Sequence, residues 1–393
     1  MPDQLGDPRP DGGVPVPRRP HRPVTTSTSA ASAASGTAPP GVVVASWLGS
    51  TNLGDELLYR ALRDQLVARG AAVTGISTDP AATATVHDTS ALPHADPRAW
   101  WPELRDTRRL VFGGGGLLQD ESSRWNVPYH LARVATGRAA RARVVAVGLG
   151  GGRLHAPSRA AVRTVLGPVP IGARDRATVD QLRGIGCHDV RLTGDLAFSL
   201  PRPSAEPEDV LTVCLRPRNV GGGWRPAAGS WRAGLPTPAQ LDRLARAVGG
   251  AAAAHGLGVR LVAFQADRDG VLHDELATRL TGVDVEVVTP DVDQVLGVVA
   301  RSRVVLAMRF HAAVAGVLGG VPVVAAAYSS KVAELAADAP ASVTDLAVPL
   351  AELHPDHLAA ALAGHPDRRA AELAALIERE RGNGRLLDDL LAG

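Results

Sequence analysis

The sequence predicts an α/β protein made of two Rossmann-like domains that face each other across a cleft, followed by C-terminal helices. At 393 residues the chain is too long for one ordinary domain. Short apolar runs alternate with helical patterns in two successive series, as in parallel sheets covered by helices. A stretch rich in Pro, Ser and Glu, residues 201–207, separates the series. Such sheets bind ligands beyond the carboxyl ends of their strands, so the strand-to-helix turns are the candidate sites.

The first series opens with the β-branched run Gly41–Leu48, which predicts a strand, and a loop over 49–54. Leucines spaced four apart then predict a helix from Asp55 that ends at Gly70. Further predicted strands are Val73–Ser77, Leu110–Phe112, Arg143–Val147, Ile171–Ala173 and Val190–Thr193, with helices at Asn126–Thr136, Ser158–Leu166 and Thr178–Arg183.

The second series follows the same alternation. Its predicted strands are Val210–Leu215, Val259–Phe264, Val283–Val288, Val304–Met308 and Val321–Ala326. Its predicted helices are Pro238–His255, Val271–Leu280, Val292–Ala300, Ala312–Leu318 and one after Ser330. The predicted parts of the chain are a disordered tail over 1–40, domains over 41–203 and 204–349, and C-terminal helices over 350–393.

Composition excludes several classes of protein. A net charge of +2 argues against a broad nucleic-acid footprint, so any anion site must be local. Cys187 and Cys214 form neither a disulfide framework nor a metal-ligand spacing, which fits a reducing cytoplasm. No run approaches the ~20 apolar residues that would span a bilayer, so we expect a soluble protein.

Lys331 is the only lysine among 42 basic Lys and Arg residues. Where only positive charge is needed, this bias would install Arg, so Lys331 suggests a need for a compact ammonium. Chance is the alternative explanation.

Two predicted turns of the first domain carry acidic residues or glycines. Asp55 and Glu56 stand at a helix N-terminus, where a carboxylate either serves as a general base toward a hydroxyl group or complements the helix dipole. Gly113, Gly114, Gly115 and Gly116 follow a predicted strand, so their backbone, together with that of Gly54 in the first turn, can cradle a ligand, although glycine runs also serve tight packing. The run has neither a P-loop ending nor the dinucleotide fingerprint, which argues against ATP and NAD.

Two further turns carry cations. Arg174 ends a predicted strand beside Asp175, with a surface ion pair as the alternative explanation. Arg309 and His311 flank a predicted helix N-terminus, which together make a receptor for phosphate or carboxylate, whereas a lone His is usually structural. Lys331 follows the next predicted strand and is expected near the same pocket.

The four turns together resemble those of the polysaccharide pyruvyl transferase family. The motifs are N-L-G-D-E at 52–56, G-G-G-G at 113–116, R-D at 174–175 and R-F-H at 309–311. The segment G-D-L-A-F at 194–198 is similar to the family's D-P-A-F element, with Leu196 in place of the proline. Leu215-Arg216-Pro217 resembles the strand that carries S-x-R, with Cys214 where Ser is common. The resemblance covers roughly residues 42–334.

The resemblance implies a GT-B-like fold, phosphoenolpyruvate as donor and a saccharide diol as acceptor, which would give a pyruvate ketal. It implies donor binding by Arg174, Arg309 and His311, which we extend to Lys331. The C-terminal domain is the expected donor-binding domain, and the N-terminal domain is expected to carry the acceptor side and the catalytic turns. Candidate acids are His311 and Lys331, and candidate bases are Asp55 and Glu56.

These assignments require no metal and no cofactor beyond phosphoenolpyruvate as co-substrate. We expect a cytoplasmic protein whose acceptor, if lipid-linked, would bring it to the inner face of the cell membrane. Two alternatives are a nucleotide-sugar glycosyltransferase on the same fold, with its cations on a diphosphate, and a non-catalytic anion-binding module.

Overall fold

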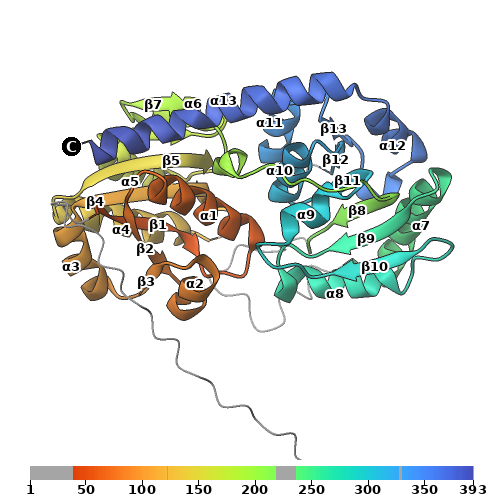
Figure 1. Cartoon of the computed structure of the whole chain (residues 1–393), viewed down its shortest axis with the longest axis horizontal. Coiled ribbons are helices and arrows are strands. Elements are labelled where there is room, and N and C mark those ends of the chain that lie inside the picture. Colours follow the sequence, from red (N-terminus) through yellow and green to blue (C-terminus); the bar gives the residue numbers. More distant parts are fainter. Residues whose placement is uncertain (1–38, 122, 218–235, 327–329, 393) are drawn as a thin grey trace, which may run out of the picture. The chain divides into compact units, whose positions relative to one another are not determined.

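The computed structural model describes residues 39–121, 123–217, 236–326 and 330–392. The predicted tail therefore falls almost wholly outside the described residues, as do Tyr328 and Ser329 before Lys331. The described chain contains two parallel sheets with helices packed on them, followed by C-terminal helices, as the alternating pattern predicts (Figure 1). The fold prediction is confirmed.

The first sheet has the strand order β3-β2-β1-β4-β5-β6-β7, and all its paired strands run parallel. Its strands are β1 Gly41–Leu48, β2 Ala72–Ser77, β3 Ser90–Pro93, β4 Arg109–Leu118, β5 Arg143–Gly151, β6 Ile171–Ala173 and β7 Val190–Leu192. Its helical segments are α1 Leu53–Val67, α2 Pro80–His87, α3 Pro97–Thr107, α4 Asn126–Ala139, α5 Ala156–Leu166, α6 Arg176–Ile185 and the 3-10 helix η1 Leu196–Ser199.

The second sheet has the order β10-β9-β8-β11-β12-β13, again with parallel pairing. Its strands are β8 Val210–Cys214, β9 Gly258–Val262, β10 Val285–Val288, β11 Val304–Ala307, β12 Val323–Ala325 and β13 Val343–Asp345. Its helices are α7 Pro238–Ala254, α8 Ala266–Ala277, α9 Val295–Ala300, α10 Phe310–Gly319 and α11 Ser330–Asp338. The C-terminal segments are η3 Leu350–Glu352, α12 Pro355–Leu362 and α13 Pro366–Leu391.

The glycine run lies inside a strand, and its prediction as a turn is wrong. β4 continues through Gly113–Gly116 to Leu118 and pairs with β5, with Gly113 opposite Val147 and Gly115 opposite Leu149. Three of these glycines have positive φ, which a strand of larger residues rarely adopts. The strand extends because β5 offers a parallel partner along this length.

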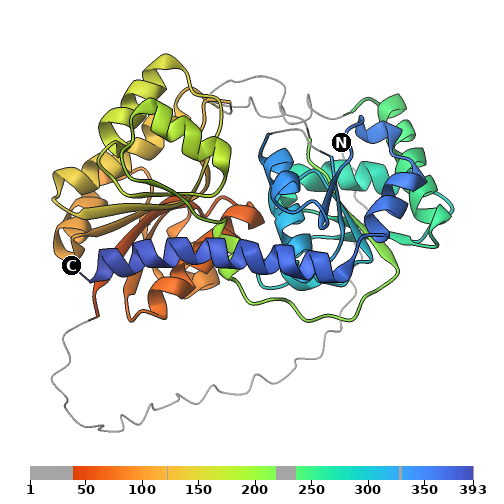
Figure 2. The ribbon, with the colours of Figure 1, turned by 90° about the horizontal axis from the view of Figure 1, so that it is seen from above.

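The core joins the two sheets. One apolar cluster contains Leu58 and Leu62 of α1, Val314 and Val317 of α10, and Leu387 of α13. The backbone amide of Leu53 also donates to the carbonyl of Phe264, at 2.9 Å, between the start of α1 and the end of β9. Helix α13 leaves the second sheet and runs along the first, as both views show (Figures 1 and 2).

Candidate functional site

The N-terminus of α1 holds Asp55 in its first turn. Asn52 caps this helix, accepting from the amide of Gly54 at 3.3 Å and donating to the carboxylate of Asp55 at 2.5 Å. Burial raises the pKa of Asp55 to about 6, although His311 and Asn52 act in the opposite direction. Asp55 can therefore gain and lose a proton near neutral pH.

Glu56 points to a different set of partners. One of its oxygens accepts from the amides of Gly49 and Ser50 at 2.9 and 3.3 Å, and the other lies 2.7 Å from Nε2 of His87. The neighbouring carboxylates thus differ, since Glu56 fixes the loop before α1 while Asp55 faces the second sheet.

Arg174, Asp195 and His311 meet at the edges of the two sheets. Arg174 follows β6 and donates to Oδ2 of Asp195 at 2.9 Å, and Nε2 of His311 lies 3.8 Å from the same oxygen. His311 comes from the first turn of α10, on the other sheet. Its Nε2 has no hydrogen-bond partner within the described part of the chain. The carboxylate of Asp195 therefore lies between basic side chains from two domains, the guanidinium of Arg174 and the imidazole of His311.

Asp195 stays ionised despite its burial. Burial alone would raise its pKa, but His311, Arg174 and the amide of Ala197 lower the pKa of Asp195 to about 2. The amide of Ala197 donates to Oδ1 at 3.1 Å and so fixes Asp195 at the start of η1. Asp195 is consequently a permanent negative charge beside His311.

Phe310 packs against this cluster. Its ring centroid lies 4.2 Å from Cζ of Arg174, a cation–π contact between the two domains. The guanidinium of Arg174 is thus held by an ion pair on one side and an aromatic ring on the other.

Lys331 brings a second cation from α11 against the first sheet. Burial, followed by repulsion from Arg174, lowers the pKa of Lys331 to about 8, while Glu121, Asp55 and Asp175 act in the opposite direction. The ammonium therefore loses its proton much more readily than an exposed lysine.

Glycines allow the side chains of Arg174, His311 and Lys331 to approach the backbone. A Cβ atom built on Gly54 would overlap the imidazole of His311, and one on Gly116 would overlap the ammonium of Lys331. A Cβ on Gly150 would lie 2.6 Å from Nε of Arg174. Each of these basic side chains thus lies against backbone that carries no side chain. The sequence predicts that such glycines let a ligand approach closely, and here side chains of the protein itself make the close approach.

The other members of the predicted glycine cradle pack against protein. A Cβ on Gly113 would overlap the backbone carbonyl of Val147, while those on Gly114 and Gly115 would lie 3.2 and 3.1 Å from the side chain of Leu58. Asp55 approaches the Cβ position of Gly115 at 3.5 Å. Within the run, Gly116 is the position that meets a predicted site cation.

Arg309 lies apart from this cluster in its contacts. Its guanidinium forms an ion pair with the buried carboxylate of Asp269 and lies 3.5 Å from the side-chain oxygen of Gln265. Both partners belong to the start of α8. The structure thus brings together Asp55, Arg174, His311 and Lys331, and directs Arg309 to Asp269.

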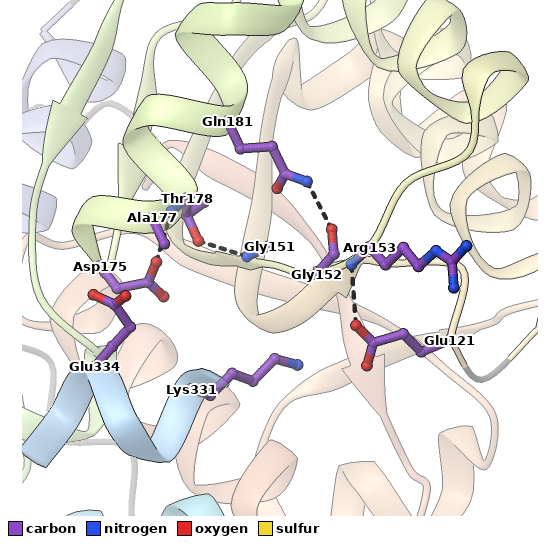
Figure 3. A pocket seen from close by; sticks show the side chains of 10 residues that line it. All are labelled: Glu121, Gly151, Gly152, Arg153, Asp175, Ala177, Thr178, Gln181, Lys331 and Glu334. Atoms are coloured by element: carbon purple, nitrogen blue, oxygen red, sulfur yellow. Dashed lines mark hydrogen bonds between the residues drawn. The ribbon is translucent and has the colours of Figure 1, made fainter. Parts of the chain in front are cut away.

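A cavity of about 260 Å³ opens beside Lys331 (Figure 3). Its lining comes from the end of β5, the start of α6, the β4–α4 loop and α11, and comprises Glu121, Gly151, Gly152, Arg153, Asp175, Ala177, Thr178, Gln181, Lys331 and Glu334. Thr178 accepts from the amide of Gly151 at 2.7 Å, and Gln181 donates to the carbonyl of Gly152 at 2.7 Å. The polar lining is therefore held in place by its own hydrogen bonds.

Comparison with protein families decides the relationship that the motifs indicate. The family described as polysaccharide pyruvyl transferase matches residues 52–330, which is most of the chain. This chain belongs to the polysaccharide pyruvyl transferase family. The match contains Asp55, Arg174, Asp195 and His311, and it ends just before Lys331. No curated protein matches the sequence significantly.

Solved structures share the fold of this pyruvyl transferase family member. UDP-GlcNAc 2-epimerase from Neisseria meningitidis, bound to UDP-GlcNAc, superposes with a TM-score of 0.53 and 10% identity over 90% of this chain and 98% of its own. A glycosyltransferase from Rickettsia africae gives 0.55 and 9% over 89% and 98%. MnaA of S. aureus, solved with UDP, gives 0.55 and 11% over 89% and 94%. At these identities the likeness establishes the GT-B-like fold alone.

Two residues of the cluster were not predicted as site residues. Asp195 lies in the G-D-L-A-F segment, so the resemblance could have indicated it. Phe310 is the middle residue of R-F-H, but a contact with Arg174 across two domains has no signal in the sequence. Among the described residues, no group of three His, Cys, Asp or Glu side chains could hold a metal ion, and no described helix could cross a membrane.

Proposed function

We propose that this protein transfers the pyruvyl group of phosphoenolpyruvate to two hydroxyl groups of a saccharide and forms a pyruvate ketal. The observation that carries the proposal is the meeting of Arg174, His311 and Lys331 with Asp55 at the facing edges of the two sheets. Membership of a transferase family supports the reaction class.

In this proposal Arg174 and Lys331 bind the donor, phosphoenolpyruvate. Phosphoenolpyruvate carries a carboxylate and a phosphate, and a guanidinium with an ammonium supplies charge-assisted donors for both. Arg174 is held rigidly by Asp195 and Phe310, so little conformational freedom is lost when it binds an anion. Arg309 would influence the donor only through Asp269 and α10.

His311 is the acid in this proposal. Protonation of the methylene carbon by His311 would leave an oxocarbenium-like carbon, and the ionised Asp195, 3.8 Å from Nε2, would stabilise the imidazolium before transfer. Lys331 would neutralise the phosphate as the bond between C2 and the phosphate oxygen breaks.

Asp55 is the base. The first hydroxyl group of the acceptor attacks C2 and gives its proton to Asp55, and the second hydroxyl group then closes the ring, with its proton passing to the departing phosphate or to water. One proton enters the new methyl group and two leave the hydroxyl groups, so the products are the ketal and inorganic phosphate. Positioned acid and base groups of this kind each contribute about 10²- to 10⁴-fold.

The cavity beside Lys331 suits the acceptor. Its carboxylates and the amide of Gln181 are the groups that recognise sugar hydroxyls by hydrogen bonding. We propose that the saccharide enters here and reaches the donor across Lys331, whether or not it is attached to a lipid carrier at the membrane.

The test compares donors. The full-length protein is incubated with phosphoenolpyruvate or with UDP-sugars and a panel of free and lipid-linked saccharides, with phosphate release and product mass as readouts. We expect phosphate release and a product heavier by one pyruvate ketal, abolished in His311→Ala and retained in His188→Ala, which removes an exposed imidazole. Turnover of a UDP-sugar would support the glycosyltransferase alternative, and donor binding without turnover the anion-binding module.

A further inference from the structure

We propose that the C-terminal helix α13 completes the active site, with Asn383 as a positioning residue for Asp195. This inference rests on the proposed function. The helix lies beyond residue 330, where the family match ends. It packs on β5, β6 and β7 of the first sheet and on η1 (Figure 1). Arg174 directly follows β6, and Asp195 directly precedes η1.

Asn383 ties together two segments of the site. Its side chain is fully buried and accepts from the amide of Gly148 at 3.0 Å. Nδ2 of Asn383 donates to the carbonyl of Gly194 at 2.9 Å. Gly194 directly precedes Asp195, and Gly148 lies two residues before Gly150, against which Arg174 rests. One side chain thus fixes the strand under Arg174 and the loop that presents Asp195.

Glycines on both sides make this contact close. A Cβ on Gly194 would lie 2.9 Å from the backbone nitrogen and Cα of Glu380, and one on Gly172 would lie 2.6 Å from Oδ1 of Asn383. A Cβ on Gly382 would lie 3.0 Å from Cγ2 of Thr193. Apart from proline, glycine is the least favourable residue in a helix interior, so its presence beside Asn383 indicates that close approach is required there.

Glu380 fastens the other end of η1 through Gln65. The amide of Gln65 donates to Glu380 at 2.9 Å and to the hydroxyl of Ser199, the last residue of η1, at 3.0 Å. Gln65 belongs to α1, whose first turn carries Asp55. Helix α13 therefore connects the elements that present Asp55, Arg174 and Asp195.

The distances in the cluster make this positioning matter for turnover. Asp195 lies 2.9 Å from Arg174 and 3.8 Å from His311, so a shift of the 193–195 loop changes both contacts at once. Removal of the Asn383 amide would leave a buried N–H and a buried carbonyl without partners, and the loop would move to satisfy them.

The test uses the full chain and compares Asn383→Leu with Leu387→Ala. Leu387 is fully buried on the same helix and belongs to the apolar core, so its truncation lowers thermal stability without removing a hydrogen bond to the site. We expect kcat of Asn383→Leu to fall about tenfold or more, with KM for phosphoenolpyruvate changed less than about threefold, because a misplaced charge affects the proton step most. Leu387→Ala should keep kcat per folded molecule.

A second readout does not depend on the reaction. Hydrogen exchange of residues 193–199 is measured in both variants, at a temperature where both are folded. We expect faster exchange of this segment in Asn383→Leu and not in Leu387→Ala. Equal exchange in the two variants, or wild-type kcat in Asn383→Leu, would overturn the inference. If the wild-type protein does not use phosphoenolpyruvate, the proposed function fails while the exchange experiment still decides whether Asn383 holds the loop.

Discussion

Arg174 and Arg309 each follow a strand of a parallel sheet, one in each domain, and have different environments. Each follows a parallel strand, β6 or β11, and each is buried with a carboxylate partner. Arg174 shares Asp195 with His311 and lies near Lys331, so three basic side chains lie close together. Arg309 pairs with Asp269, beside His273, whose pKa burial and Arg309 lower to about 4. Although each arginine follows a parallel strand, Arg174 shares its carboxylate partner with a side chain of the other domain, whereas Arg309 forms an ion pair within its own domain.

Replacing each arginine by lysine gives the largest expected contrast. Arg174→Lys keeps the charge but loses the planar contact with Phe310 and the geometry at Asp195, so kcat/KM should fall roughly hundredfold. Arg309→Lys should lower the melting temperature, because Asp269 is fully buried, and change kcat/KM less than about tenfold. The turn alone would predict heavy loss of activity for Arg309→Lys. Kinetics and thermal melts on both variants check this. If Arg309→Lys lost more kcat/KM than Arg174→Lys, Arg309 and not Arg174 would be the main donor-binding arginine.

Asp55 and Glu56 provide the next contrast. Asp55→Asn should reduce turnover by about 10²-fold. Because burial raises the pKa of Asp55 in the folded state, folding disfavours its charged form, and the neutral amide should leave the melting temperature equal or higher. Glu56→Gln should instead cost about 1–3 kcal/mol of stability with nearly unchanged turnover, because it disturbs the bonds to Gly49 and His87. If turnover were lost in Glu56→Gln and not in Asp55→Asn, Glu56 would be the base and Asp55 the structural carboxylate.

The pH dependence of turnover tests the roles of Asp55 and Lys331 together. Turnover should fall below about pH 6 as Asp55 takes up a proton and can no longer act as base. It should also fall above about pH 8 as Lys331 loses its proton. In Lys331→Arg the part of the alkaline limb that Lys331 causes should disappear because the guanidinium stays charged, while turnover at pH 7 falls about tenfold. Wild-type turnover in this variant would mean that the single lysine is an accident of composition.

The smallest expected effect separates a site glycine from an ordinary one. Gly116→Ala should displace the flexible end of Lys331 and lower turnover about three- to tenfold with little change in stability. Gly184 is exposed in α6 with open space around it, so Gly184→Ala should raise the free energy of unfolding by roughly 0.5–1 kcal/mol and leave turnover unchanged. Urea melts and initial rates check the two variants. Equal turnover in Gly116→Ala and Gly184→Ala would mean that Lys331 takes no part in the reaction.

Most strands could be predicted from the sequence because β-branched runs occur where buried parallel strands need them. The segment α2-β3-α3 was missed, since Ala and Thr in 80–87 give no apolar stripe and β3 is only Ser-Ala-Leu-Pro. The glycines at 113–116 indicated a turn by their propensity. In the structure they belong to β4, because their backbone pairs with β5. The domain boundaries remain predictions.

By itself the sequence determined the two alternating series, the family and the residue types at the strand ends, because these depend on local pattern and spacing. Tertiary structure alone decided which of those residues meet. Asp195 reaches Arg174 across 21 residues, and Asn383 reaches Gly148 across 235. No local rule specifies such pairs, since they follow from how α13, α10 and the two sheets pack, and burial then sets which charges are shared and which are neutralised.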